Sequence, residues 1–408
     1  MTELLAPAGN LERLKTAFRY GADACYLGAT SMSLRNFADN FTLQELEEAC
    51  ALARRLGKRV YVACNAFARD NDIDRLPPLL RSIEAAGADA IILNDAGVLS
   101  VAREVTPNME LHLSTQANTL NSAASLFWHR QGIKRIILAR ELTLNEICEM
   151  RKRLPKSLEL EVFVHGAMCV SYSGRCLLSN YIAGRDSNKG ECAQPCRWTY
   201  EMRETDTNGE HFTIEQDDIG TYILNSRDMC LIEHLPQLID AGVSSLKIEG
   251  RMKSIAYVAT VVNAYRMALD TLYEARAAGK EFVLPQRILR EVSYASHRPY
   301  TTGFFFGESK ENGQETHFSA YLQDAEISAT VLEYDAEAKE AYIEQRNRFF
   351  AGDTLNVLSP GDVGREFRVG YIRNEAGELV DSAPHPKERL YIGCDCAVKT
   401  GDILRKAK

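Results

Sequence analysis

One unit recurs along most of the chain: a short apolar run, a polar or glycine turn, and an amphipathic helical stretch. Within each helical stretch, apolar residues return at steps of three and four, which places them on one face of a helix. Eight such units of roughly thirty residues predict an α/β chain and favour a closed (β/α)8 TIM-like barrel over an open parallel sheet. The expected strands are Glu3–Ala6, Ala24–Gly28, Arg59–Asn65, Ala90–Asn94, Glu110–Gln116, Arg135–Ala139, Leu158–His165 and Ser244–Glu249.

Glycine precedes several of these strands, at Gly21, Gly87, Gly132 and Gly242. A glycine there lets a helix end in the left-handed conformation before the chain re-enters the sheet. No Gly-x-Gly-x-x-Gly and no P-loop sequence follows a strand, so the dinucleotide and nucleoside triphosphate classes lack their phosphate cradle. The clearest helical patterns are Leu43–Leu56, Leu76–Ala86, Asn121–Gln131 and Leu144–Leu154.

The connection after the seventh expected strand, about residues 166–242, differs from the others because it holds four cysteines: Cys169, Cys176, Cys192 and Cys196. Gathered thiolates suit zinc or an iron–sulfur cluster. The gaps between them are six, fifteen and three residues, unlike the Cys-x-x-Cys knuckles of zinc sites, and this favours iron–sulfur. Since the βα loops of a barrel form its catalytic face, the cysteines are predicted at the barrel mouth.

Past the cysteines, the polar stretch Glu201–Asp218 predicts an exposed excursion, and a helix is expected from about Asp228 to Asp240. The apolar-faced stretch Ser254–Tyr273 would supply the eighth barrel helix. From about residue 318 short β-like runs alternate with Gly, Pro and Asp turns, so we expect a barrel domain over residues 1–310 and a small all-β, barrel-like domain over 318–408. The runs are Ser328–Glu333, Ala341–Gln345, Thr354–Leu358 and Phe367–Ile372.

The composition is that of a soluble globular protein, with 45% hydrophobic and 25% charged residues. No signal peptide or membrane span is evident, so a cytoplasmic protein without a membrane partner is expected. Eleven cysteines, an odd number, argue against a disulfide framework in that compartment. The net charge of -8 gives no global attraction to nucleic acid, so any RNA contact needs a local basic patch, such as Arg251 with Lys253 or Lys134 with Arg135.

Polar residues at the ends of the expected strands are the candidate site residues, because these ends face the mouth. Alternation along Glu110–Gln116 sends His112, Ser114 and Gln116 to one side of the strand. The predicted catalytic residues are His165, Lys247 and Glu249, although a salt bridge inside the barrel would also explain the last two. The predicted substrate-binding residues are Asn65, Asn94, His112, Gln116, Arg140 and Arg251.

Several motifs resemble the signature of the U32 peptidase family, and the similarity extends from Glu3 to about Gly303. The first is Glu161-x-Phe163-x-x-Gly166-Ala167-Met168-Cys169, followed by Gly174-x-Cys176-x-Leu178-Ser179 and Gly190-x-Cys192-x-x-x-Cys196-Arg197-Trp198. Further motifs are Asn225-Ser226-x-Asp228, Ser245-Leu246-Lys247-Ile248-Glu249-Gly250-Arg251 and His297-Arg298-x-Tyr300-x-x-Gly303-Phe304.

Within that family the chain is most similar to the branch that hydroxylates the wobble uridine of tRNA without dioxygen. The resemblance implies a 4Fe-4S cluster on Cys169, Cys176, Cys192 and Cys196, with prephenate as hydroxyl donor. It also implies tRNA as the partner, together with a possible homologous U32 protein. Guanidinium groups such as Arg140 and Arg251, with the Lys247 ammonium, suit a dicarboxylate of this kind.

Other interpretations stay open at this point. A related hydroxylase could act on rRNA or on a ubiquinone precursor, and the family name records collagenase-like proteases, for which Cys169 with His165 could serve as nucleophile and base. A structural zinc module is a third possibility, and Cys230 is a rival fourth ligand to Cys196. The remaining cysteines are expected to be packing residues or without a metal: Cys25, Cys50, Cys64, Cys148, Cys394 and Cys396.

Overall fold

The computed structural model describes residues 1–28, 40–169, 171–172, 175–185, 192–198, 216–217, 220–221, 227–307 and 321–407. The chain forms two compact units. The first contains Met1–Phe18, Ala22–Lys253 and Arg298–Tyr321, and the second contains Arg19–Gly21, Ser254–His297 and Leu322–Lys408. No helix in the described part of the chain is both long and apolar enough to cross a membrane.

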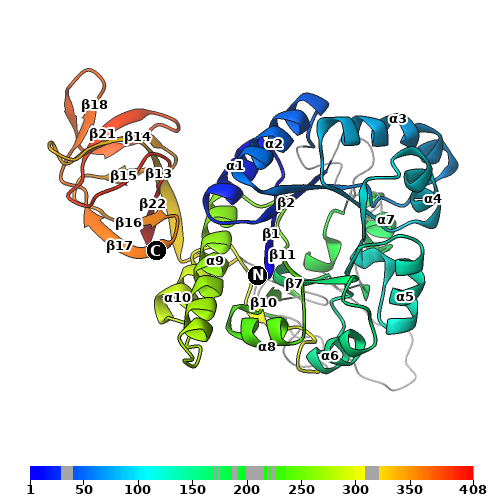
Figure 1. Ribbon diagram of the computed structural model, residues 1–408. Coiled ribbons are helices and arrows are strands. Elements are labelled where there is room, and N and C mark those ends of the chain that lie inside the picture. Colours follow the sequence, from blue (N-terminus) through cyan, green and yellow to red (C-terminus); the bar gives the residue numbers. More distant parts are fainter. Residues whose placement is uncertain are drawn as a thin grey trace. The chain divides into compact units, whose positions relative to one another are not determined.

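Eight parallel strands of the first unit close into a barrel, which confirms the predicted fold class (Figure 1). The strands pair in chain order, and pairing of β11 with both β1 and β7 closes the ring. Five expected strands are shorter than predicted, and the difference is largest for Glu110–Gln116, because after Leu113 the chain turns into a 3-10 helix at Thr115–Ala117. The barrel strands are β1 (Glu3–Pro7), β2 (Ala24–Gly28), β3 (Arg59–Ala63), β4 (Ala90–Leu93), β5 (Glu110–Leu113), β6 (Arg135–Ile137), β7 (Glu159–Ala167) and β11 (Ser245–Ile248).

Several helices of the first unit begin or end at signals that the sequence carries. Thr42 and Glu45 form a capping box at the start of α2, and Gly87 ends α3 with a φ of 85°. Helix α3 begins at Asp70, earlier than the expected Leu76, and continues through Pro77 and Pro78. The helices are α1 (Leu11–Arg19), α2 (Leu43–Leu56), α3 (Asp70–Ala86), α4 (Ala96–Val105), α5 (Ser122–Arg130), α6 (Leu144–Lys152), α7 (Leu178–Ala183) and α8 (Leu235–Asp240).

The segment after β7 extends the sheet beyond the barrel. Strand β10 (Asp228–Cys230) pairs antiparallel with the end of β7, and β12 (Tyr300–Thr301) pairs with β10. The prediction of a helix starting at Asp228 is therefore wrong. Residues Asp228–Cys230 form a strand that pairs with β7, and α8 begins only at Leu235. Most of the expected excursion at 201–218, and the motif residues Gly174, Gly190, Asn225 and Ser226, lie outside the described residues.

The second unit combines two helices with a mainly antiparallel β structure. Helix α9 (Ile255–Ala277), expected as the eighth barrel helix, belongs to this unit, as does α10 (Gln286–Ser293). The expected run Phe367–Ile372 is wrong as one strand, because β17 ends at Arg368 and Gly370 bonds instead to Gly393. The main sheet contains β13 (Ala325–Asp335), β14 (Glu340–Gln345), β16 (Thr354–Ser359), β17 (Asp362–Arg368), β18 (Ile372–Asn374), β19 (Leu379–Val380), β21 (Arg389–Gly393) and β22 (Ile403–Ala407).

Candidate functional site at the barrel mouth

Amide side chains join three consecutive loops at the carboxyl ends of β3, β4 and β5. The amide of Asn65 donates to Ser114 Oγ at 3.1 Å, and the amide of Asn94 donates to Gln116 Oε1 at 3.2 Å. Asn94 and Gln116 are only 7% and 5% exposed. The structure thus brings together Asn65, Asn94 and Gln116, as the sequence predicts, although Gln116 lies on the 3-10 helix and not on the strand.

Arg175 connects the cysteine-bearing segment to this amide network. Its Nε donates to the backbone carbonyl of Gln116 at 2.9 Å, and its guanidinium lies 5.6 Å from the ring of Phe67. Arg175 directly precedes Cys176, one of the four predicted ligands. Arg175 was not among the predicted site residues, and the signal that could have found it is its position between Gly174 and Cys176 of the cysteine motif.

His165 lies near the end of β7 and is almost completely buried. Its Nε2 is 3.4 Å from the hydroxyl of Tyr300 on β12, and the two rings are 5.2 Å apart. Strand β10 places Cys230 opposite His165 in its register with β7. The choice between Cys196 and Cys230 as the fourth ligand stays a prediction.

Lys247 points into the barrel, and its ammonium lies 2.9 Å from Glu161 Oε1. Arg135 also approaches Glu161, at 3.2 Å, and joins it to Glu3 on β1. Burial alone would raise the pKa of the Glu161 carboxyl, but the charges of Lys247 and Arg135 outweigh it and lower that pKa to about 2. Lys247 thus holds a buried carboxylate of the protein, and its predicted catalytic role stays a prediction.

Tyr26 on β2 connects Lys247 with Glu249, two of the predicted catalytic residues. Its hydroxyl lies 3.1 Å from Glu249 Oε2, and the Lys247 ammonium stands 4.3 Å from the centre of its ring. The sequence left open a salt bridge between Lys247 and Glu249; in the structure the Lys247 ammonium pairs with Glu161, and Glu249 accepts from the Tyr26 hydroxyl. Tyr26 was not among the predicted site residues. Alternation along the strand would have pointed its side chain into the barrel and the side chains of its neighbours Cys25 and Leu27 the other way.

His112 lies apart from the mouth group. In the strand register it stands beside Arg135, the first residue of β6, and therefore on the amino-terminal side of the barrel. It is fully buried, with Nε2 3.0 Å from Glu110 and its ring 4.8 Å from that of Tyr61. Burial lowers the pKa of the imidazole, against the opposing hydrogen bond to Glu110. This position gives its predicted substrate-binding role no support.

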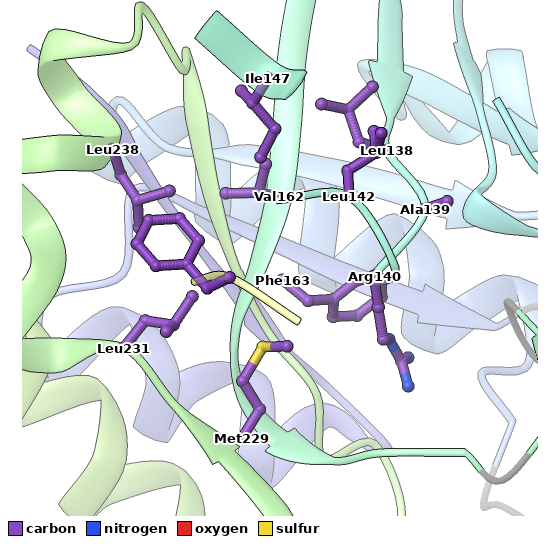
Figure 2. A pocket seen from close by; sticks show the side chains of 11 residues that line it. Leu138, Ala139, Arg140, Leu142, Ile147, Val162, Phe163, Met229, Leu231 and Leu238 are labelled. Carbon is purple, nitrogen blue, oxygen red and sulfur yellow. The ribbon is translucent and has the colours of Figure 1, made fainter. Parts of the chain in front are cut away.

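Arg140 follows β6 at the rim of a small apolar pocket. Its guanidinium stacks on Phe163 at 4.1 Å and donates to the carbonyl of Ala167 at 3.0 Å. Figure 2 shows the guanidinium turned away from the apolar lining residues Leu138 and Ile147. The cavity of about 20 Å³ has room for about one water molecule, so it is too small for a substrate.

Arg251 follows β11 and is only 4% exposed. Its carbonyl packs against Gly9 in the loop after β1, where a Cβ on residue 9 would come within 2.3 Å of that oxygen. The absence of a side chain at Gly9 therefore lets the first and last loops of the barrel approach each other.

Three of the four predicted ligand thiols accept a hydrogen bond from the backbone amide two residues later. The amides of Leu178 and Gln194 donate to the sulfurs of Cys176 and Cys192, both at 3.4 Å. The residue Cys169 is exposed, yet crowding by protein atoms raises the pKa of its thiol. The charges of Cys176 and Cys192 raise it further, while the Ser171 amide and Arg140 lower it.

These effects place three thiols and Arg140 within electrostatic range of one another. Amides directed at sulfur are a common feature of cysteines that bind iron–sulfur clusters. Across the described ranges, however, no three His, Cys, Asp or Glu side chains stand close enough together to coordinate a metal ion. The donor set therefore fits a thiolate-bound cluster in its chemistry and hydrogen bonding, and the ligand assignment stays a prediction.

The other cysteines behave largely as packing residues. Cys25 and Cys64 are completely buried in the barrel, and burial raises the pKa of the Cys64 thiol to about 12. Cys50 is buried on α2, and Cys148 on α6 is partly exposed. In the second unit, the thiol of Cys394 lies 3.0 Å from the carbonyl of Cys396.

Comparison with known families matches two models to the chain. Peptidase family U32 matches residues 9–315, and the peptidase family U32 C-terminal domain matches residues 323–405. The chain belongs to peptidase family U32. This confirms the family resemblance that the cysteine motifs carry.

Several relatives of this chain are named for RNA hydroxylation, and another is named collagenase. The chain is 39% identical over 406 residues to tRNA hydroxylation protein P1 of Bacillus subtilis (strain 168), covering 100% of this chain and 95% of that protein. It is 36% identical to tRNA hydroxylation protein P of Escherichia coli (strain K12), covering 94% and 91%. It is 35% identical to the 23S rRNA 5-hydroxycytidine C2501 synthase of Escherichia coli (strain K12), covering 67% of this chain and 40% of that protein.

Proposed function

We propose that this U32 protein is a tRNA-modifying hydroxylase that forms 5-hydroxyuridine at the wobble position. In this proposal prephenate donates the hydroxyl group, dioxygen is not required, and a 4Fe-4S cluster bound by the cysteine segment is essential. Near full-length similarity to two tRNA hydroxylation proteins supports the substrate class. The structural observation that carries the proposal is the bond from Arg175 to Gln116, which ties the cysteine segment to polar groups at the barrel mouth.

The residues of the cysteine segment suit a bound cluster. Cys169, Cys176, Cys192 and Cys196 would hold it, and backbone amides already point at the first three of these sulfurs. A cluster in that position supplies electron transfer or a charged anchor for the substrate. The neighbouring Arg140 would offset part of the negative charge of the thiolates, since its guanidinium lies within electrostatic range of Cys169.

Arg140 and Arg251 are the proposed anchors of the dicarboxylate. Arginine can grip a carboxylate with two parallel hydrogen bonds, and both residues follow barrel strands at the mouth. Lys247 lies deeper inside the barrel, where its partner Glu161 is fully buried. The proposed proton-transfer groups are His165, next to the Tyr300 hydroxyl, and Glu249, next to the Tyr26 hydroxyl.

The tRNA would bind through local contacts, because the chain as a whole carries a net charge of -8. Lys253 is a candidate on the first unit, because its ammonium stands 4.4 Å from the ring of Tyr321, which is exposed. Aromatic and cationic side chains together suit unpaired nucleotides. A homologous U32 protein could complete this surface, and adding one would then raise activity on tRNA.

The first test is anaerobic purification followed by an absorption spectrum and analysis of iron and sulfide. We expect broad visible absorption, which Cys169→Ser abolishes and the matched variant Cys394→Ser in the second unit leaves intact. A colourless protein that contains zinc would overturn the cluster and favour a structural zinc site. Activity on tRNA should fall at least about 100-fold in Cys169→Ser, the scale expected when an essential catalytic group is removed.

The second test identifies the substrate by mass analysis of RNA nucleosides from a strain that lacks this protein and any paralogue. Loss of 5-hydroxyuridine and its derivatives from tRNA supports the proposal. The similarity to a 23S rRNA 5-hydroxycytidine synthase favours rRNA as the second candidate, although the match covers only 40% of that protein. Loss of 5-hydroxycytidine from rRNA, with tRNA unchanged, would establish that alternative.

Protease activity is a weaker candidate on this geometry. It needs His165 close to the Cys169 thiol, whereas His165 Nε2 lies against the hydroxyl of Tyr300. Hydrolysis of a collagen peptide that persists after removal of iron, and disappears in Cys169→Ser, would reverse this judgement.

A further inference from the structure

The side-chain amides of Asn94 and Gln116 form a pair joined by one hydrogen bond, which the oxygen of Gln116 accepts. The Asn94 amide nitrogen donates to Gln116 Oε1 at 3.2 Å. Asn94 Oδ1 is buried and has no hydrogen-bond partner among the described residues. Since a side-chain amide carries one acceptor and two donors, the pair presents the Asn94 oxygen together with the N–H groups of Gln116.

The surroundings hold this pair in place. Ser114 Oγ accepts from the Asn65 amide and, at 3.4 Å, from the backbone N–H of Gln116, while Arg175 donates to the carbonyl of Gln116. A buried acceptor without a donor is unfavourable, and a bound ligand is one way in which such a group is satisfied. The rigid support and the unpaired oxygen together indicate a site for a ligand that brings its own N–H.

We propose that Asn94 and Gln116 read the imide edge of a uracil base, an inference that rests on the proposed function. Uracil has an N3–H donor between two carbonyl acceptors. N3–H would donate to Asn94 Oδ1, and a neighbouring carbonyl would accept from the Gln116 amide. Because Arg175 bonds to Gln116 and precedes Cys176, a base held here lies beside the cysteine segment.

This arrangement selects uracil over cytosine. Cytosine N3 is an acceptor, so it would face the Asn94 oxygen without a proton between them. A site built to hydrogen-bond one partner rejects an analogue that lacks the donor, because its own buried groups are then left unpaired. Asn94 is thus a specificity-determining residue that would separate a uridine hydroxylase from a cytidine hydroxylase of the same family.

The experiment uses the whole protein, purified with its cluster, and anticodon stem-loop RNAs with uridine, 3-methyluridine or cytidine at the wobble position. Binding is measured by fluorescence anisotropy, and hydroxylation is followed by nucleoside mass analysis with prephenate present. The wild type should prefer uridine to both other RNAs by about 10-fold or more in binding and in kcat/KM. Removal of N3–H by methylation tests the same hydrogen bond from the substrate side.

Two variants change the pair in opposite ways. Asn94→Leu removes the acceptor and should reduce the preference for uridine over 3-methyluridine to less than about 3-fold. Gln116→Met frees the Asn94 amide to rotate and present its N–H groups, which should raise relative binding of the cytidine RNA. Gln131→Ala, a change at an amide after α5 that accepts from Arg103, should keep the wild-type preference.

Each outcome decides between the two proposals. If correctly folded Asn94→Leu keeps the wild-type preference for uridine over 3-methyluridine, the reading role is overturned. If that variant does not fold, an unchanged preference for uridine over cytidine in Gln116→Met overturns it instead. Binding that prefers uridine without hydroxylation supports the reading role and rejects the tRNA hydroxylase function. Equal binding of all three RNAs by the wild type overturns the inference, while turnover of uridine RNA in that case leaves the proposed function standing.

Discussion

Buried polar groups are satisfied differently in the two units of this protein. In the second unit, the terminal nitrogens of Arg405 donate to Glu291, Asn356 and Thr260, all within a fully buried cluster. At the mouth of the first unit, Asn94 keeps an oxygen without a partner in the described structure. The guanidinium Nε of Arg405 also lacks a hydrogen-bond partner among the described residues, but Glu291 compensates its charge, whereas the unpartnered atom at the mouth is a neutral acceptor that a ligand with an N–H group would satisfy.

The largest effect is expected from Glu291→Gln in the second unit. Burial raises the pKa of the Glu291 carboxyl while Arg405 opposes this, so the pair contributes mainly through mutual compensation. Removing one charge leaves Arg405 buried and uncompensated, which should lower the free energy of unfolding by about 3–5 kcal/mol. Urea denaturation measures this change.

The matched control replaces the pair by apolar residues of similar size, Glu291→Leu with Arg405→Met. Its stability should stay within about 2 kcal/mol of the wild type, because no charge is then stranded. If the double variant were less stable than Glu291→Gln, the cluster would have a role beyond charge compensation.

The next effect is expected from Glu161→Gln in the barrel. The Glu161 pKa of about 2 lies below its ordinary value, so this carboxylate stabilises the fold above about pH 4.5, and the contribution disappears as the pH falls towards 2. The variant should be less stable by about 3 kcal/mol at pH 7. Its stability should also depend less on pH between 5 and 2, as thermal melts across that range would show.

Tyr26→Phe should have a smaller effect, because it removes one hydroxyl from the Glu249 carboxylate and leaves the ring beside Lys247. We expect a loss of about 1 kcal/mol in stability and a kcat about 10-fold lower on tRNA, with KM unchanged. Steady-state kinetics separates the two constants. An unchanged kcat would remove Glu249 from the catalytic group.

The smallest effect is expected from Asn65→Ala, at the outer end of the amide network. The Asn65 amide donates only to Ser114 in a partly exposed position, so stability should fall by less than about 1 kcal/mol. The KM for the RNA should rise a few-fold while the uridine preference persists. A loss of that preference would extend the reading site to the loop after β3.

Much of the fold follows from local sequence signals. Helix α2 begins at a Thr42 capping box and ends at Gly57, and its bounds match the prediction because both signals lie within the helix itself. The start of β10 was mistaken for helix, because its structure depends on hydrogen bonds to the end of β7 about sixty residues earlier in the chain. Of the predicted site residues, Asn94 and Gln116 come together, whereas His112 lies with Arg135 on the amino-terminal side of the barrel.

By itself the sequence determined the order of the eight barrel strands, the family, and the position of the cysteine segment after the seventh barrel strand. These follow from hydrophobic periodicity, glycine helix ends and motif spacing, all of which are local. Only the tertiary structure decided that Lys247 bonds to Glu161, and that Tyr26 lies between Lys247 and Glu249. The reason is physical: partners inside a closed barrel are set by the register between strands, and residues 86 and 223 positions apart meet only once the ring has formed.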